Sequence, residues 1–149
     1  MKRVLLFVSM LFISLGIFAQ YVDLGLPSGT KWKSFNEPGF YSYEEAISKF
    51  TDQLPTYDQL GELYGVCDWI WLGSAYKVIG PNGNFIKFPA AGFRGCSGNV
   101  YCVGSRGYYW SSTPYGSNSA YHLDFFSGIV SMSYSGDRCN GQSVRLVQD

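Results

Sequence analysis

Few side chains in this 149-residue chain are suited to catalysis. The sequence contains one histidine, His122, and eleven Asp and Glu residues, and no nucleophile stands near them at a recognisable spacing. Covalent catalysis needs a nucleophile, a base and a group that orients the base. Ser111 lacks the Gly-x-Ser-x-Gly context of a hydrolase serine. The sequence therefore predicts no catalytic residue and a protein that is not an enzyme.

The four cysteines are Cys67, Cys96, Cys102 and Cys139. Four cysteines allow three disulfide pairings, and their order does not choose among them, although a bond between Cys96 and Cys102 would close a short surface loop. Free thiols are one alternative, and an enzyme with a cysteine-based site is a rival class. Metal ligation is another alternative, but the spacing matches no zinc pattern. We therefore expect no metal site and no cofactor.

The segment 119–134 predicts two strands joined by a Ser-Gly turn. Because strand side chains alternate between faces, Leu123 and Phe125 share the inward face, which Val130 and Met132 continue on the return strand. The outward face mixes acidic, basic, hydroxyl and large apolar side chains, and exposed large apolar groups indicate contact with a ligand. The predicted ligand-binding residues, on this face and in the turns around it, are Tyr115, Asn118, His122, Asp124, Phe126, Ile129, Ser131, Ser133, Tyr134 and Asp137.

Helix signals occur early in the chain and strand signals late. Ser42 and Thr56 each stand where a helix N-cap is expected, with apolar residues at helical spacing behind them. We therefore predict an α+β fold with two N-terminal helices and a mainly antiparallel C-terminal sheet. The predicted strands are 21–26, 31–35, 85–88, 107–112, 120–126, 129–134 and 143–147.

Seven short segments occur in order along the chain: DLGLPSGTKW at 23–32, LPT at 54–56, CDWIW at 67–71, GPNGN at 80–84, PAAGFR at 89–94, GYYWSST at 107–113 and GQSVRLV at 141–147. Together they resemble the Fibrobacter-type major paralogous domain, common in secreted proteins of gut Bacteroidetes. The resemblance implies a C-type-lectin-like fold over a single domain, residues 20–149, although the stretch between Asn36 and Leu54 is shorter than in many members. Arg94 and Arg145 lie inside these motifs, and we expect them to be buried partners of carbonyls or carboxylates.

The C-type-lectin-like fold suggests calcium-dependent sugar binding, but the sequence does not favour a calcium site. Calcium takes several oxygen ligands, whereas the late region offers only Asp124, Asp137 and scattered Asn. The Glu-Pro-Asn and Trp-Asn-Asp motifs of calcium-binding lectins are missing from that region. Trp32, Trp69 and Trp71 are candidates for stacking on a sugar, but packing in the core is the favoured interpretation.

From Tyr115 to Asn140 the chain contains no Lys, Glu, Gln or Trp. Every residue present except Met132 is reachable by changing the adenines of an Asn codon. This pattern resembles the variable region of a target protein of a diversity-generating retroelement; the alternative is a Gly- and Ser-rich surface that simply lacks these residues. The resemblance implies a ligand-binding module with a diversified C-terminal face, and the other candidate function is a carbohydrate-binding or adhesion accessory domain.

Residues 1–19 have the pattern of a cleaved signal peptide. Lys2 and Arg3 precede the apolar run Val4–Phe18, and the small residue Ala19 that follows it suits a signal-peptidase site. The run is shorter than the about 20 residues of a membrane-spanning helix. Removing those two charges leaves nine basic against eleven acidic residues. We therefore expect a secreted or cell-surface protein with a protein or glycan ligand at the cell exterior. We expect no nucleic-acid partner and membrane contact only through the signal peptide before cleavage.

Overall fold

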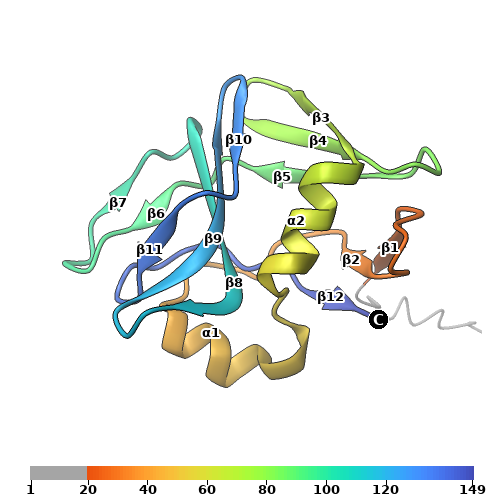
Figure 1. Ribbon diagram of the computed structural model, residues 1–149. Coiled ribbons are helices and arrows are strands. Elements are labelled where there is room, and N and C mark those ends of the chain that lie inside the picture. Colours follow the sequence, from red (N-terminus) through yellow and green to blue (C-terminus); the bar gives the residue numbers. More distant parts are fainter. Residues whose placement is uncertain (1–19) are drawn as a thin grey trace, which may run out of the picture.

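The computed structural model describes residues 20–149, so the predicted signal peptide at 1–19 lies outside the described residues. Both ends of the described chain meet in one antiparallel sheet (Figure 1). In it β1 (Tyr21–Asp23) pairs with β2 (Lys31–Lys33), and the far edge of β2 pairs with β12 (Val147–Gln148). The C-terminal strand therefore closes the structure beside the first hairpin.

The two predicted helices form where their N-cap residues place them. Helix α1 is Tyr43–Phe50, and the Ser42 hydroxyl accepts the Glu45 N–H at its start. A short 3-10 turn follows α1, and then α2 (Tyr57–Val66) begins at Thr56 with a complete capping box to Gln59. Each cap satisfies backbone donors that an isolated helix leaves free. Among residues 20–149, neither helix is long and apolar enough to cross a bilayer.

The middle of the chain forms two small antiparallel sheets. Strands β3 (Asp68–Trp71), β4 (Ala75–Ile79) and β5 (Phe85–Pro89) pair in chain order. Strands β6 (Phe93–Arg94) and β7 (Val100–Tyr101) form a hairpin that lies on the opposite side of the molecule in Figure 1.

The longest strands belong to a four-stranded sheet. Strand β8 (Arg106–Tyr115) pairs antiparallel with β9 (Ser119–Phe126). On its other edge β9 pairs first with β10 (Ile129–Ser131) and then with β11 (Ser135–Asp137). These helices and mainly antiparallel sheets confirm the predicted α+β class.

Four predicted strands extend beyond the observed ones. The strands 21–26 and 31–35 end at Asp23 and Lys33, and two later strands differ more. The strand 129–134 ends at Ser131, because the Ser131 hydroxyl accepts the N–H of Ser133 and the chain turns there before β11 resumes the ladder. Of the predicted strand 143–147, only Val147 lies in a strand, at the start of β12. The segment before Val147 runs beside β8. There the Ser143 carbonyl accepts the backbone N–H of Trp110, and the Ser143 backbone N–H donates to the Tyr108 carbonyl.

One disulfide joins Cys96, in the turn between β6 and β7, to Cys139, just after β11. Among the pairings that the sequence left open, the structure therefore has Cys96–Cys139 and not the short Cys96–Cys102 loop. The pairing across 43 residues follows from long-range backbone bonds, since Arg94 and Gly141 exchange N–H···O bonds and bring the two segments together. Cys67 is a buried free thiol and Cys102 an exposed one.

Two apolar clusters hold the sheets and helices together. The larger cluster lies against the inward face of β8 and β9, where Tyr109, Leu123 and Phe125 are almost fully buried. The smaller cluster lies on the opposite face of the same ladder, where α1 covers Trp110 and Ala120. Helix α1 covers only that end of the opposite face and leaves the other end open.

Candidate functional site

The uncovered end of the β8–β9 ladder carries side chains from both strands on one face. Across the ladder Arg106 pairs with Phe126, and Tyr108 pairs with Asp124. His122 lies on the same face, between the Tyr108 ring at 5.7 Å and the Trp110 ring at 6.1 Å. The alternation of the strands therefore gathers a basic, an acidic, an imidazole and several aromatic groups on one surface.

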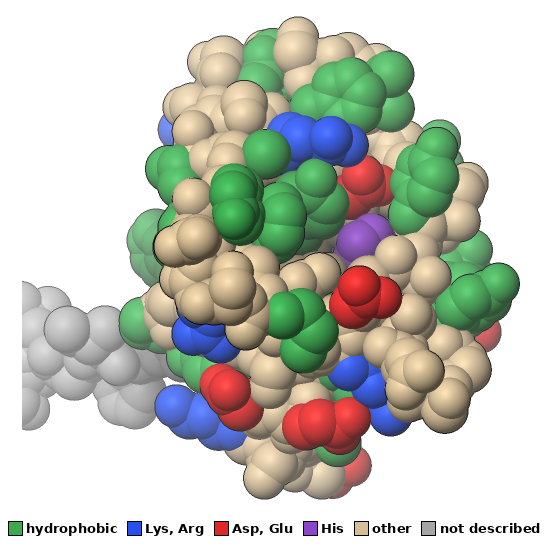
Figure 2. All heavy atoms as spheres, turned by 90° about the vertical axis from the view of Figure 1, so that its left-hand side faces the viewer, with side chains coloured by type: hydrophobic (Ala, Val, Ile, Leu, Met, Phe, Trp, Pro, Cys, Tyr) green, Lys and Arg blue, Asp and Glu red, His purple; other side chains and the backbone are tan. Residues whose placement is uncertain are grey.

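This surface is hollowed. A large hollow of about 600 Å³ lies over Arg106, Asp124 and Phe126, and a small hollow of about 240 Å³ adjoins it. Tyr108, His122 and Ser135 line both, and we call the two hollows together the groove. In Figure 2 the single histidine, in purple, lies at the bottom of this hollow among acidic, basic and apolar side chains. The other lining residues are Phe93, Ile129, Val130, Ser131, Tyr134, Gly136, Asp137, Asn140 and Gln142.

Asp124 and Arg106 form an ion pair on the floor of the large hollow. The Arg106 Nη2 lies 3.6 Å from Asp124 Oδ2, and its guanidinium lies 4.8 Å from the centre of the Phe126 ring. Asp124 is 5% exposed. Burial raises the pKa of the Asp124 carboxyl, and the positive charge of Arg106 opposes that change.

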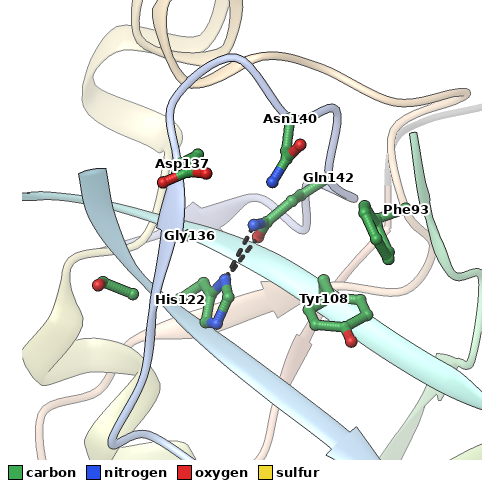
Figure 3. A pocket seen from close by; sticks show the side chains of 8 residues that line it. Phe93, Tyr108, His122, Gly136, Asp137, Asn140 and Gln142 are labelled. Atoms are coloured by element: carbon green, nitrogen blue, oxygen red, sulfur yellow. Dashed lines mark hydrogen bonds between the residues drawn. The ribbon is translucent and has the colours of Figure 1, made fainter. Parts of the chain in front are cut away.

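His122 is held from the other side by Gln142. The Gln142 side-chain amide lies 2.9 to 3.1 Å from His122 Nδ1, as the dashed lines of Figure 3 show. In the same view Phe93 and Tyr108 stand on one side of this pair, and Asp137 and Asn140 lie above it. Burial lowers the pKa of His122 to about 4, so the imidazole is neutral at pH 7.

Three buried polar atoms on this floor have no hydrogen-bond partner: Arg106 Nε, His122 Nε2 and Asp124 Oδ1. Among residues 20–149 the one other such atom is Trp32 Nε1, in the larger apolar cluster. Buried polar atoms are paired in the great majority of cases, because leaving one unpaired costs about 1–3 kcal/mol. All three atoms belong to side chains that line the groove. The atoms themselves are covered in this conformation, so a ligand reaches them only when these side chains turn toward the groove.

The structure brings most of the predicted ligand-binding residues together. Tyr115 and Asn118 lie instead at the turn between β8 and β9, and Ser133 lies in the exposed bend between β10 and β11. One expectation needs correction: His122 and Asp124 face the predicted way but are only 4% and 5% exposed, because neighbouring strands rise around them. The seven predicted residues that line the groove are His122, Asp124, Phe126, Ile129, Ser131, Tyr134 and Asp137.

Sequence reasoning missed the contributions of β8 and of the segment after β11. Arg106 and Tyr108 share the groove face because β8 is the neighbour of β9, and Gln142 reaches it from a segment that runs beside β8. Arg106 and Tyr108 alternate with Gly107 and Tyr109, which face inward. This alternation could have predicted that Arg106 and Tyr108 face the groove. No local signal points to Gln142.

The arginine and tryptophan predictions have mixed outcomes. Arg145 is 1% exposed and donates to Asn36 Oδ1 and to backbone carbonyls, which confirms a buried structural role. Arg94 is only half-buried. Trp32 is fully buried in the core, as favoured. Trp69 and Trp71 pack against the core but also line a separate hollow of about 450 Å³.

Two other features bear on metal binding and on cysteine chemistry. Residues 20–149 contain no cluster of three or more His, Cys, Asp or Glu side chains that could hold a metal ion. Cys67 is buried, and burial raises the pKa of its thiol to about 11. A thiol that stays protonated at pH 7 is a poor nucleophile.

Comparison with known proteins places the chain in a family. A family model described as a domain of unknown function, DUF8237, matches residues 68–147. The chain belongs to the DUF8237 family. The matched range of this DUF8237 protein begins at β3 and contains every residue that lines the groove. No curated protein and no solved structure matches the chain.

Proposed function

We propose that this DUF8237 protein is an exported module that captures a ligand in the groove without chemical turnover. The observation that carries the proposal is the set of three unpaired buried atoms, Arg106 Nε, His122 Nε2 and Asp124 Oδ1, on the floor of an aromatic-walled hollow. Ligand sites typically combine mostly apolar walls with a few placed polar groups. A ligand that pairs these atoms removes an energetic cost that the free protein carries.

Binding fits this chemistry better than catalysis. His122 contacts an amide, Gln142, and not a carboxylate that would orient it as a base. A pKa of about 4 also makes it a weak proton acceptor at pH 7. Both properties suit a neutral hydrogen-bonding group.

The finer assignments of fold and location belong to the same proposal. Two early helices followed by a late antiparallel sheet are what the resemblance to the major paralogous domain implies, so we propose a C-type-lectin-like fold. Export to a secreted or surface location is supported by the signal-like residues 1–19 and by the disulfide between Cys96 and Cys139. Disulfides persist mainly in oxidising, extracytoplasmic compartments.

The test compares two variants of the full-length protein. The double variant His122→Gln and Asp124→Asn changes the groove floor with little change in volume. The matched control, Asn118→Ala with Ser133→Ala, changes two exposed residues that lie outside the groove. Binding is measured on a display library of extracellular proteins and on a glycan array. We expect the groove variant to lose whatever wild type and control both bind; equal binding by all three would refute the proposal.

We further propose that residues 115–140 are the variable region of a diversity-generating retroelement target. Support comes from the residue types present and from their placement, since most residues that line the groove fall in this segment. The test is the flanking DNA. A near-repeat of the coding 3′ end that differs only at adenines should lie beside a reverse-transcriptase gene, and its absence would refute the idea for this locus.

A further inference from the structure

The charges of Arg106 and Asp124 balance in the large hollow, which restricts the ligand that can bind there. Arg106 is the one Lys or Arg among the residues that line the groove, and its guanidinium is already paired with Asp124 at 3.6 Å. His122 is neutral at pH 7. An anionic ligand would therefore find no free cation and would meet the carboxylates of Asp124 and Asp137. A cationic ligand would meet the Arg106 guanidinium in the large hollow, and only the Asp137 carboxylate at the small hollow would attract it.

The three unpaired atoms have mixed hydrogen-bonding character. Arg106 Nε can only donate, Asp124 Oδ1 can only accept while ionised, and His122 Nε2 donates or accepts according to the tautomer that Gln142 selects. A hydroxyl group donates one hydrogen bond and accepts others, and it rotates to suit its partners. Neighbouring hydroxyls therefore match this floor better than the fixed N–H and C=O of a peptide unit.

The walls provide apolar faces above these polar atoms. Tyr108 packs edge-to-face against Phe93 at 5.0 Å, Phe126 flanks the guanidinium, and Tyr134 is 62% exposed at the rim. Such rings can contact the C–H faces of a sugar ring through weak, additive interactions. The shared lining of the large and small hollows gives room for a ligand longer than one ring.

We propose that the ligand is a neutral glycan, a short chain of uncharged sugars, bound without calcium. This inference rests on the proposed function, because it names the class of ligand that the same groove takes. Sugar hydroxyls pair with the side chains of Asp124, Arg106 and His122, which turn to expose their unpaired atoms. The aromatic walls contact the ring faces. None of these contacts uses a metal ion, and residues 20–149 hold no cluster of three or more His, Cys, Asp or Glu side chains that could bind one.

The experiment uses the full-length protein on an array of neutral oligosaccharides, matched sialylated and sulfated glycans, and short neutral peptides. Each is measured with and without EDTA. We expect binding to neutral oligosaccharides that EDTA leaves unchanged. Asp124→Asn should weaken it about tenfold or more, because a hydrogen bond to a charged carboxylate is replaced by a weaker one to a neutral amide. The matched control Asp52→Asn, at an exposed residue outside the groove lining, should leave it unchanged. Methylating the hydroxyls of the bound oligosaccharide should weaken binding similarly, which tests the inference even if the variant misfolds.

The outcomes separate this inference from the function it rests on. Binding only to charged glycans, or neutral-glycan binding that EDTA abolishes, overturns the inference. Peptide binding that Asp124→Asn removes also overturns it, but leaves the groove as a ligand site. Glycan binding that neither Asp124→Asn nor hydroxyl methylation changes overturns both, because the groove floor then plays no part.

Discussion

The buried His122 makes a quantitative prediction about stability and pH. In the unfolded chain the imidazole titrates with its ordinary pKa of 6.5, whereas burial lowers the pKa to about 4 in the folded protein. As pH falls below 6.5, His122 therefore becomes protonated in the unfolded chain, whereas in the folded protein it stays neutral down to about pH 4. The stability that His122 contributes as a neutral group is present above pH 6.5 and is lost over this window.

The size of the effect follows from the difference in pKa. One pKa unit corresponds to about 1.36 kcal/mol, so the fall from 6.5 to about 4 corresponds to about 3 kcal/mol. Asp124 acts in the opposite direction, because burial raises its pKa and the folded protein gains its proton first as pH falls. The net loss in the wild type is therefore smaller than the His122 contribution alone.

The assay is urea unfolding at several pH values between 7.5 and 4, on the wild type and on His122→Gln. Glutamine is neutral at every pH and can still bond to Gln142. Asp124 is present in both proteins, so its contribution cancels in the comparison. We expect the free energy of unfolding of the wild type to fall by about 3 kcal/mol more than that of the variant. Parallel pH dependence in the two proteins would refute the assigned burial of His122.

Three further predictions follow from other parts of the structure. Replacing Arg145 by Met should lower the free energy of unfolding, measured by urea unfolding, by about 3–5 kcal/mol. The reason is that the buried carbonyl and amide oxygens that accept from Arg145 lose their donor. A loss below about 1 kcal/mol would contradict the structural role of Arg145. Replacing both Cys96 and Cys139 by Ala should cost about 4 kcal/mol, from the entropy of a loop of 43 residues. Equal urea midpoints for this variant and the oxidised wild type would argue against the bond. If a retroelement template exists, its adenine differences should change groove codons such as that of Asp124 and spare core codons such as that of Phe125; sequencing the repeat decides this.

Local signals in the sequence were enough to place the helices and the two faces of β9. The hydroxyls of Ser42 and Thr56 cap the two helices because capping depends only on residues three positions away. The inward position of Leu123 and Phe125 follows from strand alternation and a large apolar core. Features that depend on one or two neighbouring residues could be predicted.

Features that depend on distant segments could not. The groove needs β8 beside β9, and the pairing of Tyr108 with Asp124 spans a turn whose register the sequence does not specify. The disulfide partner of Cys96 depends on backbone bonds between Arg94 and Gly141. The burial of His122 has the same origin, because strands on both sides of β9 enclose it.

The period-two alternation of β9 places core residues and residues of the proposed binding face side by side within five consecutive positions. From His122 to Phe126 the odd-numbered residues lie in the core and the even-numbered residues face the groove. A substitution scan should therefore alternate as well: changes at Leu123 and Phe125 should lower the yield of folded protein by leaving cavities, whereas conservative changes at the even positions should mainly alter binding. A diversified binding face on this strand is compatible with a stable fold only if variation follows the same alternation. Uniform variation across all five positions would destroy the core along with the specificity.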